Sequence, residues 1–404
     1  MGALNMRNLT GPALLLAVGV LPASGAPPPP APDPDVLVRR AAELPHQGGP
    51  RLDAAVALAR AGRVAEALRW LESAAALGVG ADLPALRTAF GAAAATPDFA
   101  RVARRFEENV APLARGEVAL RLPERDLYPE SVAYDPVRRA FYLGAMFKRK
   151  IVKVDASGAA ADFVPPGAHG LWTVLGMKVD ATRRELWANA CNLGQGPAMA
   201  NPEPDTVGRA AVLRFDLETG RLLRRYDGPA QTRPLCFNDL DLTPSGDAYV
   251  SSGPNGIFRV DRGRDVLELF AAVPGLFVNG LALSSDRRTL FLAAHAGGVM
   301  ALDLATRTWE AVALPEGATL AGVDGLYVYR DSLVAVQNAL RHGPERVVQA
   351  FLDPSRRRVT CLATLDRNHP LYDIPTTGVL VGDTLHYVAT SQLRSFEADG
   401  RPWP

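Results

Sequence analysis

Hydrophobic residues follow two different periods along the chain, and the change falls near Gly116. From Val36 to about Arg115, apolar side chains recur every three to four residues in a segment rich in Ala, Leu and Arg, which predicts helices. After Gly116, short apolar alternations of period two lie between turn-forming clusters such as Asp-Pro and Glu-Thr-Gly, which predicts strands. We therefore expect a mainly β protein with a small α-helical region, 36–115, in front of a β domain, 116–404.

The helical region contains one segment with a specific pattern. Residues 57–74 resemble a tetratricopeptide helix pair, with Gly62 at the tight turn and small residues where the helices meet. One such pair cannot bury both of its faces, so we expect it to pack on the β domain or on a protein partner. A helical spacer and a peptide-binding region both fit this pattern.

The β domain repeats itself six times, at a spacing close to the roughly 40 to 50 residues of a propeller blade. Several units continue into a third strand that ends in an Asp turn, which favours four-stranded blades. The sequence thus predicts a six-bladed β-propeller, with the extended residues 116–122 available as an outer strand that closes the ring. The first residue of each unit defines a common register, which holds Glu130, Leu175, Asn238, Asn279, Asp324 and Thr377.

Residues at one register of a propeller converge at one end of the axial channel, so the register can be interpreted as a site. Two carboxylates and two amides, without histidine or thiol, suit a hard cation such as Ca²⁺ better than zinc or copper. The alternative is that Asn279-Gly280 and Asp324-Gly325 are only hairpin turns. Each dipeptide, however, begins an apolar alternation, and a separate turn signal follows downstream. We therefore expect a Ca²⁺ site, with another divalent cation also possible.

The segments that carry this register are Pro129-Glu130, Phe237-Asn238-Asp239, Val278-Asn279-Gly280 and Val323-Asp324-Gly325. They resemble the four calcium-ligand motifs of the regucalcin/gluconolactonase family and are more distantly similar to paraoxonases. The resemblance covers Gly116 to the C-terminus and implies that Glu130, Asn238, Asn279 and Asp324 bind the metal. It also implies a lactone or ester as substrate and Asp324 as the general base.

The sequence departs from these families at two positions that contact substrate in them. Cys236 stands where gluconolactonase-type members carry an arginine, and Leu175 stands near the position of a paraoxonase histidine. Our leading hypothesis is a calcium-dependent hydrolase of the lactonase or esterase type. The alternative is a non-enzymatic, calcium-stabilised propeller that binds a peptide or an envelope protein, with the helical region contributing to the contact.

The N-terminus and the composition bear on location and partners. Residues 1–25 combine one arginine, a short apolar run and small residues before a cleavage point, which predicts a signal peptide, and 26–35 form a proline-rich linker. We expect a periplasmic or secreted protein without a membrane span. The net charge of +1 gives no overall attraction to nucleic acid. Of three cysteines, Cys191 and Cys236 lie near neighbouring loops, and their pairing is left open.

Overall fold

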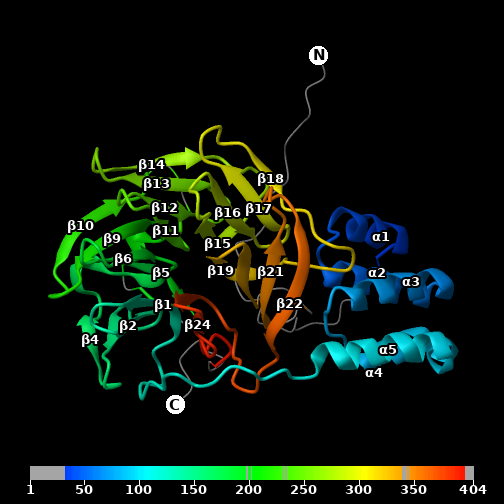
Figure 1. The fold of residues 1–404 in the computed structure, drawn as a ribbon. Coiled ribbons are helices and arrows are strands. Elements are labelled where there is room, and N and C mark those ends of the chain that lie inside the picture. The colour runs from blue at the N-terminus through cyan, green and yellow to red at the C-terminus, as the bar shows by residue number, and fades with distance from the viewer. Residues whose placement is uncertain are drawn as a thin grey trace. The chain divides into compact units, whose positions relative to one another are not determined.

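The computed structural model describes residues 32–196, 199–201, 203–230, 232, 234–338, 343 and 345–395. The expected signal peptide, 1–25, and most of the proline-rich linker, 26–35, lie outside the described residues. Helices come first in the chain and strands follow, so the mainly β fold with a small helical region is confirmed (Figure 1).

The helical region contains five α-helices and a 3₁₀ turn. In chain order they are α1 (Pro34–Glu43), α2 (Gly48–Arg60), α3 (Val64–Ala76), α4 (Leu83–Phe90), η1 (Gly91–Ala95) and α5 (Pro97–Val110). Side chains cap three of them, because Asp33, Asp82 and Thr96 accept backbone N–H groups at the starts of α1, α4 and α5, and each of these helices has a proline in its first turn.

The helical region has a hydrophobic core of its own. Helices α2 and α3 form the expected pair, and Gly62 takes a φ of 78° in the turn between them, a conformation that glycine adopts without steric cost. The core residues come from all helices after α1, and they include Leu58, Leu71, Phe90, Phe99 and Phe106. The helices thus stabilise one another across one shared core.

In the described residues, the β domain contains five four-stranded antiparallel sheets, the two-stranded sheet β23–β24 and a short two-stranded sheet, β7–β8, within a loop. In the order in which strands pair, the sheets are β1 (Pro129–Asp135), β2 (Ala140–Ala145), β3 (Ile151–Val154), β4 (Ala160–Val164); β5 (Thr173–Asp180), β6 (Glu185–Cys191), β9 (Ala210–Asp216), β10 (Leu222–Asp227); β11 (Leu240–Leu242), β12 (Ala248–Ser251), β13 (Ile257–Asp261), β14 (Val266–Ala271); β15 (Val278–Leu283), β16 (Thr289–Ala294), β17 (Gly298–Asp303), β18 (Trp309–Ala311); β19 (Val323–Tyr329), β20 (Ser332–Gln337), β21 (Arg346–Leu352), β22 (Val359–Arg367); and β23 (Gly378–Val381), β24 (Thr384–Tyr387). Short elements η2 (Ala168–Gly170), β7 (Gln195–Gly196), β8 (Met199–Ala200) and η3 (Pro204–Thr206) lie in the loops before β5 and between β6 and β9.

The first strands of the six units form a ring, because each of β1, β5, β11, β15, β19 and β23 contacts the next and β23 contacts β1. The expected count of six four-stranded blades is nevertheless wrong, since the described residues form five, and the sixth unit supplies only the β23–β24 hairpin. Residues 116–122 form no strand. Leu120 and Leu122 instead pack against a hydrophobic cluster that contains Val132 of β1 and Val388. These partly buried side chains contribute apolar contacts between the first blade and the last unit without strand pairing.

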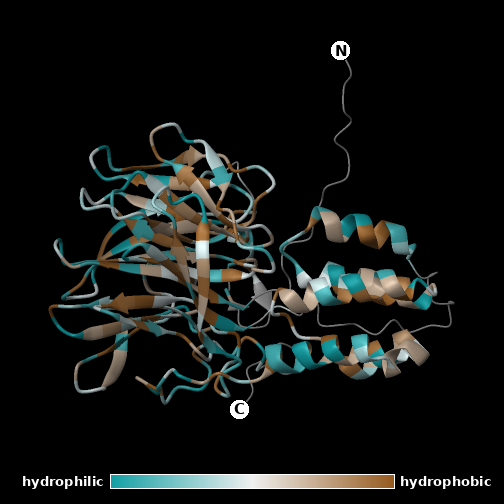
Figure 2. Cartoon of the chain, turned by 45° about the vertical axis from the view of Figure 1, so that its right-hand side comes forward, coloured by the Kyte–Doolittle hydropathy of each residue, from teal (hydrophilic) through white to brown (hydrophobic). Residues whose placement is uncertain are grey.

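The hydropathy pattern agrees with this architecture. In Figure 2 brown residues lie within the strands, whereas many of the loops that join them are teal. The helices carry both colours, as expected for segments that bury one face. Among the described residues, none of the helices has the length and apolar character that crossing a membrane requires.

Several contacts join the helical region to the fifth blade, among them hydrogen bonds from Arg367 Nε and Asn368 Nδ2 to the carbonyl oxygens of Ala111 and Asn109. Leu113 forms an antiparallel bridge with Arg367 at the end of β22. The Thr319 hydroxyl donates to the carbonyl oxygen of His46 over 2.7 Å. Arg346 at the start of β21 lies next to Gly78, at the end of α3. The expected packing of the helices on the β domain is therefore present.

A disulfide joins Cys191 to Cys236, with Cα atoms 5.1 Å apart, and Cys361 is a free, exposed thiol. The bridge links the end of β6 in the second blade to the segment before β11 in the third blade. The pairing that the sequence left open is present in the structure.

Candidate metal centre at the mouth of the ring

The mouth is the end of the ring where the first strands begin, and it carries the predicted register. In four blades the first strand has a register shift at this point, between Pro129 and Ser131, Val174 and Met177, Val278 and Leu281, and Val323 and Leu326. Glu130, Asn279 and Asp324 therefore lie on β-bulges, which redirect side chains and are common near functional sites. The interpretation of Asn279-Gly280 and Asp324-Gly325 as hairpin turns is wrong, because both dipeptides lie inside strands.

The glycine in the second-blade bulge shows why these bulges pack closely. The Gly176 N–H donates to the carbonyl oxygen of Asn238 over 2.7 Å. A Cβ at Gly176 would lie 2.6 Å from that oxygen, so a larger residue would push the two blades apart. Gly280 and Gly325 likewise have backbone atoms of the next unit close by. The glycines allow the six units to converge.

Backbone carbonyls of the register residues are used to join neighbouring units. Thr376 and Thr377 hydroxyls donate to the carbonyl oxygen of Glu130 over 2.8 and 2.9 Å. The Ser131 hydroxyl donates to the Leu175 carbonyl, and the Ser251 hydroxyl donates to the Asn279 carbonyl. These contacts fix the backbone of the mouth through its carbonyl groups and use none of the side chains of Glu130, Asn238, Asn279 and Asp324.

Asp324 is the central acceptor of the mouth. Its Oδ1 accepts a hydrogen bond from Asn279 Nδ2 over 2.8 Å, and its Oδ2 accepts one from Asn338 Nδ2 over 2.7 Å. The side chain is 7% exposed. Two amides therefore orient this carboxylate, one from Asn279 of β15 and one from Asn338, which directly follows β20. Asn279 is itself a predicted ligand.

Several oxygens of the mouth have no donor. Within the part of the chain that the structure describes, Glu130 Oε2, Asn238 Oδ1 and Asn279 Oδ1 are buried without a hydrogen-bond partner. Leaving a buried acceptor unsatisfied costs about 1 to 3 kcal/mol each. Such a set of acceptors without donors fits a bound cation, which would contact all of them at once.

The charges at the mouth lead to the same conclusion. Burial and the nearby charges of Asp324 and Asp239 raise the pKa of Glu130 well above its usual range. Burial, opposed in part by the Asn338 hydrogen bond, raises the pKa of Asp324 to about 6. Burial also raises the pKa of Asp239 to about 6, although Lys178 opposes the shift. The mouth thus concentrates carboxylates without enough positive charge to balance them.

Amide oxygens would have to complete any metal shell. In the described ranges, no three His, Cys, Asp or Glu side chains are spaced to hold a metal ion. Asn238 and Asn279 would supply the missing oxygens, and Ca²⁺ accepts amide and carboxylate oxygens together. The residues present therefore fit a hard divalent cation.

Sequence reasoning missed four side chains near this set. Asn338 contacts Asp324 but follows the second strand of its blade, so no register signal marks it. Asp239 acts on Glu130 and Asp324 through its charge and directly follows Asn238, which was a usable signal. Tyr327 is buried and its hydroxyl accepts the Gly378 N–H. Lys178 Nζ lies 5.2 Å from the centre of the Tyr327 ring.

The remaining register residues have other roles. Leu175 is 5% exposed in a hydrophobic cluster between the second and third blades. The Thr377 hydroxyl is used on the Glu130 carbonyl. Four of the six register positions therefore retain side chains suited to a cation.

The disulfide borders the third-blade part of the mouth, because Cys236 precedes Asn238 by two residues. On the other side of the bridge, Asn189 of β6 is fully buried, and no described residue is a partner for either atom of its amide. The bridge ties the backbone beside Asn238 to β6 and removes the Cys236 thiol as a donor.

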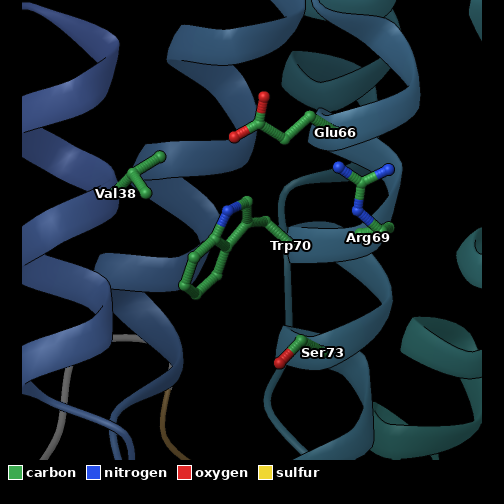
Figure 3. A pocket seen from close by; sticks show the side chains of 5 residues that line it. All are labelled: Val38, Glu66, Arg69, Trp70 and Ser73. Carbon is green, nitrogen blue, oxygen red and sulfur yellow. The ribbon is translucent and has the colours of Figure 1, made fainter.

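A different pocket lies in the helical region, with a volume of about 340 Å³ between α1 and α3 (Figure 3). Val38, Glu66, Arg69, Trp70 and Ser73 line it. Two of its polar groups are paired, because Glu66 accepts from Arg63 and the Ser73 hydroxyl accepts from Arg51. None of the five lining residues has a buried oxygen without a partner. It therefore lacks the unsatisfied oxygens that mark the mouth.

Comparisons with known proteins bear on the fold. No protein-family model and no curated protein matches the chain. Among solved structures, the chain is similar to a gluconolactonase of Xanthomonas campestris, with 15% identity and a TM-score of 0.47 over 65% of this chain and 83% of that one. It is also similar to a virginiamycin B lyase of Staphylococcus aureus, with 14% identity and a TM-score of 0.48 over 67% and 80% of the chains.

A third similar structure is a nidogen/laminin complex, with 14% identity and a TM-score of 0.43 over 60% of this chain and 80% of that one. At these identities and TM-scores the similarity carries no argument about function. The functional argument therefore rests on the residues of the mouth.

Proposed function

We propose that this protein is an exported hydrolase of the lactonase or esterase type that depends on Ca²⁺ or another divalent cation. The observation that supports it best is the set of buried acceptor oxygens on Glu130, Asn238 and Asn279, which have no donor among the described residues. Together with Asp324 these residues would hold the cation. A small lactone or ester is the proposed substrate.

The residues of the mouth would have different roles in hydrolysis. A divalent cation held there would supply Lewis-acid polarisation of the substrate carbonyl. Asp324 would accept a proton from the attacking water as the water oxygen bonds to the carbonyl carbon. It would then return this proton to the alcohol oxygen that leaves when the single bond between that oxygen and the carbonyl carbon breaks. The amide groups of Asn279 and Asn338 fix the Asp324 carboxylate for this role.

Asp324→Asn tests the proposal, because asparagine retains an oxygen ligand but accepts no proton. Loss of a general base costs about 10²- to 10⁴-fold in rate. Wild type and variant would be saturated with Ca²⁺, checked for equal occupancy, and assayed on aliphatic, aromatic and sugar lactones and on aryl esters. We expect wild-type turnover that collapses in the variant. An equally active variant would remove Asp324 from the mechanism.

One observation favours a second function, a calcium-stabilised propeller that binds a peptide or an envelope protein without catalysis. Cys236, at the position where the resembling sugar lactonases carry arginine, is bound in a disulfide and offers no donor to a substrate. Absence of turnover across the whole panel, with cation binding intact, would favour this function.

Export is part of the proposal and is supported by two features. The residues 1–25 have the pattern of a signal peptide. The Cys191–Cys236 disulfide is of a kind that persists in oxidising compartments. Fractionation of cells expressing the full chain would test it, and recovery of the uncleaved chain in the cytosol would contradict it.

A further inference from the structure

Asn338 has the same unsatisfied oxygen as the predicted ligands. It is 8% exposed, and within the described residues its Oδ1 is buried without a hydrogen-bond partner. Asn238 Oδ1 and Asn279 Oδ1 are in the same state. Asn338 lies outside the register, so neither the repeat nor the resemblance points to it.

The orientation of the Asn338 amide is determined by its neighbours. Nδ2 donates to Asp324 Oδ2 over 2.7 Å and to the Pro375 carbonyl oxygen over 2.6 Å. Both partners accept hydrogen bonds only, so rotating the amide by 180° would place oxygen against oxygen. The position of Oδ1 therefore follows from the hydrogen bonds of Nδ2.

The backbone around Asn338 is also fixed. Its N–H donates to the Gly322 carbonyl over 3.0 Å, and the preceding residue, Gln337, pairs with Val323 next to Asp324. A rigid strand end thus presents one acceptor oxygen beside the central carboxylate of the mouth.

We infer that Asn338 is a further oxygen ligand of the cation proposed above, supplied by the second strand of the fifth blade beside Asp324 from the first. The inference rests on the proposed cation site. It predicts that the fifth blade contributes two ligands, whereas the first, third and fourth contribute one each.

The test uses Tb³⁺ as a luminescent probe with the metal-stripped full chain, and Ca²⁺ as competitor. Affinity comes from titration, and the number of inner-sphere waters comes from emission lifetimes in H₂O and D₂O. Groups one step removed from a metal already affect affinity by about 10- to 100-fold. Asn338→Ala should therefore weaken Tb³⁺ binding at least about tenfold and add one inner-sphere water.

Two further variants separate ligation from positioning. Asn338→Asp keeps an oxygen at this place but cannot donate to Asp324, so it should restore the wild-type water number if Asn338 is a ligand. Asn192→Ala is the matched control, because the Asn192 amide is buried and fully paired with Glu203, Thr206 and Gly194. It should leave the water number unchanged, and melting curves would establish that each variant is folded.

The outcomes are distinct. An unchanged water number in Asn338→Ala, even with weaker binding, would overturn the inference and reduce Asn338 to a positioning residue for Asp324. Wild-type protein that binds neither Tb³⁺ nor Ca²⁺ would instead overturn the proposed cation site itself.

Discussion

Two regions of the molecule enclose charged side chains: the junction between the helical region and the fifth blade, and the mouth of the ring. They differ in whether the protein itself supplies hydrogen-bond partners for the enclosed polar groups. At the junction, Arg346 Nε donates to Gln337 Oε1 over 2.7 Å and its Nη2 donates to the Thr319 carbonyl over 3.0 Å. Gln337 in turn donates to the Ala321 carbonyl over 2.8 Å. This charge is held by protein acceptors.

At the mouth, acceptors outnumber donors. The carboxylates of Glu130, Asp239 and Asp324 lie close enough to affect one another, and the amide oxygens beside them lack partners in the described part of the chain. Most buried polar groups in folded proteins are hydrogen-bonded, so several unpaired oxygens gathered at one place favour a bound partner there. The comparison therefore indicates that the charged group at the junction stabilises the fold, whereas the charged groups at the mouth are suited to binding a ligand.

Arg346→Leu should have the largest effect and should be confined to stability. It removes the donor of Gln337 Oε1 and the charged donor of the Thr319 carbonyl, which keeps only Gln337 Nε2 at 3.3 Å. Hydrogen bonds to a charged group contribute about 1.5 to 3 kcal/mol each. We expect the free energy of unfolding to fall by about 3 to 5 kcal/mol, measured by denaturant titration. Ca²⁺ affinity of the folded variant should remain within about twofold of wild type.

Arg357→Leu is a suitable control, since this arginine pairs with Glu310 at the surface. If Arg346→Leu abolished cation binding in a protein that is still folded, the separation between junction and mouth would be wrong.

The stability of the metal-free protein should depend on pH, because ionising the buried carboxylates of the mouth costs free energy. Burial raises the pKa of Asp324 from 3.8 to about 6, so the folded chain binds more protons than the unfolded chain between these values. The contribution of this carboxyl to stability is therefore present at low pH and is lost as pH rises through about 6. Other carboxyls titrate in the same range, so Asp324→Asn is the reference.

The stability of Asp324→Asn relative to wild type should increase by about 1 to 2 kcal/mol from pH 5 to pH 8 without metal. Chemical unfolding at both pH values measures it. A difference in stability between the two proteins that does not change with pH would mean that burial does not disfavour the ionised Asp324 carboxylate. Saturating Ca²⁺ should remove the trend.

The register of the mouth was predictable because it follows a repeat, and the rest was not. Glu130, Asn238, Asn279 and Asp324 recur at one position of each unit, so periodicity alone is enough to mark them. Asn338 reaches Asp324 from the end of a second strand, and its role depends on tertiary packing. The helix pair around Gly62 was likewise visible as a local pattern.

Blade number depends on contacts between distant segments. Six repeats suggested six equal blades, but in the described part of the chain the last unit has two strands, and residues 116–122 do not pair with it. Whether residues 116–122 pair with the last unit depends on tertiary contacts between segments far apart in the sequence. A local sequence pattern does not encode such contacts.

Glu130→Gln should change the stability of the metal-free fold least among these variants. It should raise that stability but weaken cation binding. The amide removes a buried charge that lies near Asp324 and Asp239, so the free energy of unfolding without metal should rise by about 1 kcal/mol at pH 8. Ca²⁺ affinity should fall at least about tenfold. Calorimetric titration and thermal melting give both values, and an unchanged affinity would exclude Glu130 as a ligand.

The central claim is that the mouth holds a hard divalent cation, and a crystal structure of the protein grown with millimolar Ca²⁺ tests it most directly. We predict one strong density peak at the mouth, bound by oxygens of Glu130, Asn238, Asn279 and Asp324 at about 2.3 to 2.6 Å. Density that refines as water alone, with hydrogen-bond distances of about 2.7 Å or more, would contradict it.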